Sequence, residues 1–159
     1  MAERKQKPKK LNKASINKLE KEKFPIKKII IDVDGEEYEV GIHEKFRATQ
    51  IENVVKDMIW IQEECEKSGI EANVFTASLL ALMKNFTDIN FSKNDILQDI
   101  NMFINMSNLG ILDQIMSAFD PQEIEKLNKS ITDMNKNIPK ATKMMEDLMH
   151  EQVDLQLEN

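Results

Sequence analysis

Residues 27–46 read KKIIIDVDGEEYEVGIHEKF, and this stretch decides the fold expected for the 159-residue chain. Apolar and polar residues alternate on both sides of the Asp34-Gly35 dipeptide, as they do in strands that bury one face. The apolar positions are Ile29, Ile31 and Val33 before the dipeptide and Tyr38, Val40 and Ile42 after it. Because Gly accepts the positive φ of a tight turn, Asp34 and Gly35 are predicted to form the structural turn of a β-hairpin, with strands near 27–33 and 36–42. A lone hairpin is only marginally stable, so it must pack on other elements or pair with another chain.

The same stretch also resembles the opening of a calcium-binding loop at Asp32-Val33-Asp34-Gly35. Counted from Asp32, such a loop needs Gly where this chain has Glu37 and an acidic residue where it has His43. Because both positions fail, a hairpin turn is favoured over a calcium site.

From Thr49 onward the apolar spacing becomes that of helices. Thr49-Gln50-Ile51-Glu52 is predicted as the capping box of the first long helix. Helices are predicted over 49–67 and about 71–85, from 96 to the Gly110 break, over 111–119, from Asp120-Pro121 onward and after Pro139. The inward-facing residues are expected to be Ile51, Val54, Val55, Met58, Ile61 and Cys65, then Phe75, Leu79, Leu82, Met83 and Phe86, then Ile96, Leu97, Ile100, Phe103 and Ile104, then Ile111, Ile115 and Phe119, and finally Ile124, Leu127, Ile131 and Met134. The predicted fold class is mainly α, with five to six helices and one N-terminal β-hairpin (α+β by strict count).

Charge divides the chain unevenly. Residues 1–28 carry 11 basic and 3 acidic residues, whereas the remainder is strongly acidic and brings the net charge to −6. We expect a basic arm over 1–24, disordered to partly helical, then a hairpin plus helical domain over 25–138 and a C-terminal amphipathic helix over 139–159. The arm could bind nucleic acid or an anionic surface, act as a solubilising extension, or lie back on the acidic body. It has no aromatic residue before Phe24 and no groove-reading motif, which disfavours nucleic acid.

Residues that carry chemistry are scarce. The single cysteine, Cys65, has glutamates on both sides and is expected to be inert. The two histidines, His43 and His150, have no neighbour at a metal-ligand spacing. Carboxylates are plentiful, but they are expected on solvated helix faces. No apolar run approaches the ~20 residues that cross a bilayer. We therefore expect no catalytic residues, no metal site, no cofactor and no membrane association, and a protein that is not an enzyme.

Two features point to a surface for a partner. The chain has ten methionines, and Met side chains adapt to varied partners, although they also fill irregular gaps in a core. Met145, Leu148, Met149 and Leu155 form one stripe of the predicted last helix, which we expect to order against a partner or a second copy, with completion of the core as the alternative. Trp60 is predicted to cover the hairpin, with a second interface as the alternative.

The hairpin and the helix after it also suggest a family. The motif D-G-x-x-Y-x-V, here residues 34–40, leads into Phe46 and a helix that opens over 49–54. A helical remainder follows and ends in a charged, Met-rich tail. This order resembles the small tail assembly chaperones of long-tailed phages and prophages of Gram-positive bacteria, over about 30 residues of the hairpin and first helix.

The resemblance implies a non-enzymatic chaperone in the bacterial host cytoplasm. Such proteins bind the tape-measure protein and tail-tube subunits, which would be the partners of this chain. Two other functions stay open: a helical structural or scaffold component of a phage particle, and a nucleic-acid-associated regulator that uses the basic N-terminal arm.

Overall fold

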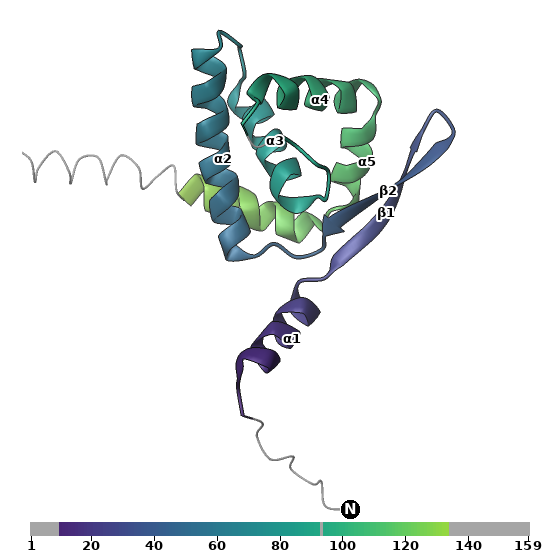
Figure 1. Cartoon of the computed structure of the whole chain (residues 1–159), viewed down its shortest axis with the longest axis vertical. Helices are drawn as coiled ribbons and strands as arrows, with labels where there is room; N and C mark the ends of the chain where they lie inside the picture. The colour runs from purple at the N-terminus through teal and green to yellow at the C-terminus, as the bar shows by residue number, and fades with distance from the viewer. Residues whose placement is uncertain (1–9, 93, 134–159) are drawn as a thin grey trace, which may run out of the picture.

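A computed structural model of the chain describes residues 10–92 and 94–133. Within these ranges the elements follow in the order α1 (Lys13–Lys23), β1 (Ile26–Val33), β2 (Glu36–His43), α2 (Ala48–Lys67), α3 (Val74–Phe86), α4 (Ile96–Asn108) and α5 (Ile111–Ala118), and a further helix covers 121–133 (Figure 1). The predicted class, mainly helical with one N-terminal hairpin, is confirmed. The predicted helix over 139–159 lies outside the described residues.

The hairpin forms where the sequence predicts it. Strands β1 and β2 pair antiparallel, with Val33 opposite Glu36, and the two turn residues both have positive φ, 54° at Asp34 and 86° at Gly35. The register places Ile31 opposite Tyr38. Both apolar alternations therefore lie on one face of the hairpin, which packs against α5.

The helical core is built on α2 and α3, which pack side by side. Helix α2 buries the predicted face except for Val55, which is half-buried, and Ala77, Leu80 and Ala81 of α3 are fully buried. Phe46, in the loop between β2 and α2, stacks on Phe86 with ring centroids 3.6 Å apart. This buried ring joins the end of the hairpin to the end of α3.

Three residues predicted to face inward do not. Phe75 is 70% exposed, Leu97 is 54% exposed and Ile104 is 48% exposed. Helix α3 is apolar on nearly every side, and it turns its alanines inward because small residues let helices approach closely. Helix α4 buries a stripe that runs on to Met106, which leaves Leu97 and Ile104 outside. Met134 lies outside the described residues.

The predicted capping box of the first long helix is also wrong. Helix α2 begins at Ala48, and it is Gln50 that accepts a hydrogen bond through Oε1 from the backbone N–H of Arg47, at 3.3 Å. A distant part of the chain fixes the residues just before the helix, because the backbone N–H of the buried Phe46 donates to the Glu123 carboxylate at 2.9 Å. Thr49 and Glu52 therefore lie within the helix.

The described part of the basic arm is helical. Helix α1 begins at Asn12, whose side chain accepts from the N–H of Ser15 at 2.9 Å. No residue of α1 is buried, and the helix projects from the body (Figure 1). This part of the arm therefore does not lie back on the acidic body. Among the described residues, no helix has the length and apolar character needed to cross a membrane.

Candidate partner-binding groove

An apolar groove of about 380 Å³ lies between the inner face of the hairpin and helices α4 and α5. The hairpin supplies one wall and the second half of α4 the other. Its lining residues are Ile31, Val33, Tyr38, Glu39, Val40, Ile89, Met102, Met106, Leu109 and Ile111. All but Glu39 have side chains that are mainly apolar.

The wall formed by the hairpin is held at both of its edges. On the β1 edge, the side-chain amide of Gln114 accepts from the N–H of Asp32 at 2.9 Å and donates to its carbonyl at 2.8 Å. On the β2 edge, the N–H of Gly41 donates to the Asp88 carboxylate at 2.8 Å, and the N–H of Asp88 donates to the Gly41 carbonyl at 2.9 Å. A Cβ at Gly41 would lie 2.6 Å from an oxygen of that carboxylate, so a larger residue here would displace the Asp88 side chain from this hydrogen bond. Because edge strands otherwise leave backbone groups unpaired, these bonds hold the hairpin against α5 along one edge and against the segment after α3 along the other.

The apolar face of the hairpin is only partly covered by the described residues. Ile31 and Val40 are buried, whereas Tyr38 is 48% exposed. On the opposite wall, Met106 is buried and Leu109 is 50% exposed. The groove thus has a buried floor and exposed apolar sides, an arrangement that fits an amphipathic helix from a partner.

The outer half of the hairpin, which we call the acidic rim of the groove, is rich in carboxylates: five of the eight residues from 32 to 39 are Asp or Glu. By the strand register Glu36 lies on the groove face and Asp34 in the turn at its end, whereas Asp32, Glu37 and Glu39 lie on the opposite face of the hairpin. Only one of these carboxylates, that of Glu39, forms an ion pair within the described residues, with Lys28 at 2.6 Å. The groove therefore favours an apolar segment that also carries positive charge.

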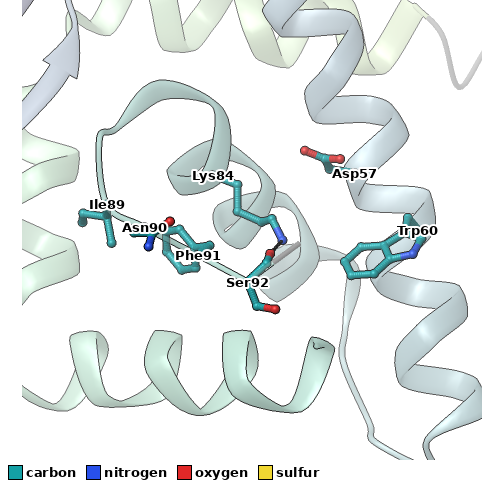
Figure 2. Close-up of a pocket in the computed structure, with 7 residues that line it drawn as sticks. All are labelled: Asp57, Trp60, Lys84, Ile89, Asn90, Phe91 and Ser92. Atoms are coloured by element: carbon teal, nitrogen blue, oxygen red, sulfur yellow. Dashed lines mark hydrogen bonds between the residues drawn. The ribbon is translucent and has the colours of Figure 1, made fainter. Parts of the chain in front are cut away.

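A second hollow, of about 500 Å³, lies between α2, α3 and the 89–92 segment and shares only Ile89 with the groove (Figure 2). Asp57 and Trp60 of α2 line one side, Lys84 of α3 reaches into it, and residues 89–92 close the other side. Lys84 Nζ lies 5.1 Å from the centroid of the Trp60 ring. Trp60 therefore covers Lys84, and the prediction that it covers the hairpin is wrong.

The charged groups around this second hollow are paired. Lys84 Nζ donates to the backbone carbonyl of Ser92 at 2.9 Å and to the carboxylate of Asp99 at 2.5 Å. Asp99 is fully buried, and its other oxygen accepts from the N–H of Ser92 at 2.6 Å. The expectation that carboxylates lie on solvated helix faces fails at Asp99, because this network fastens the 89–92 segment to α3 and α4. The arrangement holds the fold together, and the charged side chains described around the hollow have partners, since the Asp57 carboxylate accepts from the Asn85 amide at 2.6 Å.

Cys65 and His43 are the other reactive side chains that the structure describes. Burial raises the pKa of the Cys65 thiol, so the thiolate is disfavoured, as expected of an inert cysteine. Burial and the nearby Arg47 guanidinium lower the pKa of His43. The structurally described part of the chain holds no group of three or more side chains placed to bind a metal ion.

The structure brings together a different surface from the one that the sequence predicted. The turn residues Asp34 and Gly35 are where they were expected, at the open end of the groove. Trp60 lies at the second hollow, and the predicted stripe of Met145, Leu148, Met149 and Leu155 lies outside the described residues, so its role stays a prediction. The groove wall on α4 was missed, although its signal is present: Met102, Met106 and Leu109 recur at helical spacing beside the buried stripe.

Comparison with known proteins places the chain in a family. No curated protein and no solved structure matches it. A family model, that of YomO, matches residues 10–159, which is nearly the whole chain. The chain therefore belongs to the YomO family, a family of phage and prophage type.

Proposed function

We propose that this protein is a non-enzymatic assembly chaperone of a long-tailed phage or prophage, which binds apolar helical segments of a tail protein in the groove between its hairpin and α4. Its partners are the tape-measure protein and, through it, tail-tube subunits, and it acts in the cytoplasm of the bacterial host. The observation that carries the proposal is the groove itself: an apolar surface with a buried floor, exposed sides and an acidic rim.

The chemistry of the groove suits such a partner. A tape-measure protein presents long apolar helical surface before the tail tube encloses it. A chaperone for that surface must accept many sequences, and the flexible thioethers of Met102 and Met106 can adapt to different side chains. Many weak contacts along one long chain would add through avidity.

The phage character of the family and the resemblance of the hairpin to tail assembly chaperones support this choice of partner. The main competing function, a structural component of the particle, predicts the same groove but a different fate. A chaperone leaves before the tail is finished, whereas a structural component stays.

Co-purification tests the proposal. The tagged full chain is co-expressed with the tape-measure protein of the same phage, and the bound fraction is compared with that of Leu109→Ser. Because Leu109 is half-exposed, its replacement removes groove surface without opening the core. The matched control is Leu97→Ser, an exposed leucine on the same helix outside the groove.

The proposal expects the tape-measure protein to co-purify with the native chain and with the Leu97 variant, and much less with the Leu109 variant. It also expects finished tails to lack the protein. Equal capture of the tape-measure protein by both variants would show that the groove does not bind it. The presence of the protein in finished tails would favour a structural component.

A further inference from the structure

Helix α1 carries apolar residues that the described part of the chain leaves uncovered. Ile16 and Leu19, three residues apart and hence on one face, are 50% and 55% exposed. A helix of 11 residues is marginal in water without packing, even with the cap at Asn12. Among residues 10–92 and 94–133, the apolar side of α1 therefore lacks the contact that would stabilise it.

The groove has the complementary chemistry. Residues 10–24 carry five lysines and two glutamates, whereas the groove rim over 32–39 carries five acidic residues. The same chain thus carries both an apolar stripe flanked by lysines and, elsewhere, a groove whose open sides are apolar and whose rim is acidic. Such matched charges favour docking in one orientation and speed encounter.

The helix cannot reach the groove of its own chain. The end of α1 is fixed at the base of the hairpin, where Arg47 pairs with Glu20 at 3.5 Å and lies 5.4 Å from the Phe24 ring. The groove lies along the other half of the hairpin, and strand β1 alone spans about 23 Å at ~3.3 Å per residue. Helix α1 and the hairpin turn point in opposite directions (Figure 1).

We propose that α1 of one copy docks in the groove of a second copy, with Ile16 and Leu19 on its floor and its lysines against the acidic rim. Two copies can exchange their helices to close a dimer, or pass them on to form a chain. The inference rests on the groove named in the proposed function, and it adds a regulator of that groove: the neighbour's α1 covers it until a partner's segment displaces the helix.

Sedimentation of the full chain alone, across a range of concentrations, tests the docking. The arm variant is Ile16→Ser with Leu19→Ser, and the groove variant is Tyr38→Ser with Leu109→Ser. The control variant is Ile59→Ser with Leu97→Ser, which also removes two exposed apolar residues, but away from both surfaces. The native chain and the control are expected to self-associate, and each of the other two variants is expected to do so about tenfold or more weakly, the size of an interface hot spot.

Mixing identifies the two surfaces that meet. The arm variant keeps its groove and the groove variant keeps its arm, so the mixture is expected to form one-to-one pairs although each variant alone is monomeric. Pairing of two α1 helices instead predicts that the groove variant self-associates like the native chain. The salt dependence of self-association distinguishes the same two arrangements. Docking of a basic helix beside acidic residues should weaken as the salt concentration rises, whereas pairing of two basic helices should strengthen.

A native chain that stays monomeric at every concentration, or a mixture that does not pair, would overturn the inference. Because the experiment contains no tail protein, its result does not depend on the identity of the partner. The co-purification with the tape-measure protein would still test the proposed function separately.

Discussion

The hollow around Lys84 and the groove beside the hairpin differ in how many of their side chains already contact a partner group. Around Lys84 every charged group has a partner, and the buried Asp99 binds both the lysine and the backbone of Ser92. In the groove beside the hairpin, the backbone is held in place by Gln114 and Asp88, but the side chains of Tyr38 and Leu109 remain about half-exposed.

This difference separates a structural hollow from a binding surface. A paired buried charge contributes to the folded state and offers a ligand little, because binding would have to break existing bonds. Exposed apolar surface on a rigid frame gains free energy when a partner covers it. Substitutions at the hollow around Lys84 should therefore change stability, and substitutions at the groove should change binding.

The largest effect is expected from Asp99→Ala. Removal of the carboxylate leaves the ammonium of Lys84 without its counter-charge in a site where the lysine side chain is only 13% exposed. Loss of one partner of a buried pair costs about 3–5 kcal/mol of unfolding free energy. Urea unfolding measures it, and Asp99→Leu combined with Lys84→Met should recover part of the loss. An unchanged urea midpoint for the single variant would mean that the pair does not hold the fold.

A smaller loss of stability is expected from Gly35→Val, at the end of the groove wall. Gly35 has φ 86°, where a β-branched residue is strained, and no atom lies within 4 Å of an added Cβ. The cost should be about 1–3 kcal/mol and should come from the backbone alone. Gly35→Asn, which tolerates positive φ better, is the control and should lose less in thermal unfolding. Equal losses in the two variants would point to a cause other than backbone strain.

Leu109→Ser should change binding and leave stability nearly untouched. The half-exposed side chain contributes to the groove, so affinity for a tape-measure segment should fall about tenfold, while unfolding free energy shifts by less than about 0.5 kcal/mol. Trp60→Ala, at the structural hollow, should do the reverse. Calorimetric titration measures the affinity of both variants, and urea unfolding measures their stability. If the two variants lose affinity and stability to the same extent, the groove and the hollow at Lys84 do not differ in role.

The smallest effect concerns pH. Burial and Arg47 lower the pKa of His43 below its ordinary value of 6.5. As pH falls through 6.5, the unfolded chain binds the proton before the folded chain does, so stability should decrease below that pH and not above it. The variant His43→Gln should lose part of this dependence in urea unfolding between about pH 8 and pH 5. An identical pH dependence in both proteins would contradict the assignment to His43.

Local patterns in the sequence predict much of the fold. Asp34-Gly35 between two alternating runs predicts the turn and the register, because both depend on residues close in sequence. The helix end predicted at 67 and the helix start predicted at 96 are likewise present in the structure.

The candidate site could be predicted only in part, because it depends on contacts between distant residues. Gln114 is 82 residues from Asp32, and nothing near either residue shows that they pair. The burial of Asp99 depends on Lys84, and the face of α4 that lines the groove depends on where the hairpin is held. Phe75 was misplaced for a similar reason: α3 is apolar on nearly all sides, so only its packing on α2 decides which side is inward.

The central claim is that the groove, and not the hollow at Lys84, receives the partner. Hydrogen exchange of the full chain, alone and in complex with the tape-measure protein of the same phage, tests this most directly. The account predicts slower exchange on binding over 30–40 and 102–111, with residues 57–60 and 90–92 unchanged. Protection confined to 57–60 and 90–92, with the groove segments unaffected, would contradict it.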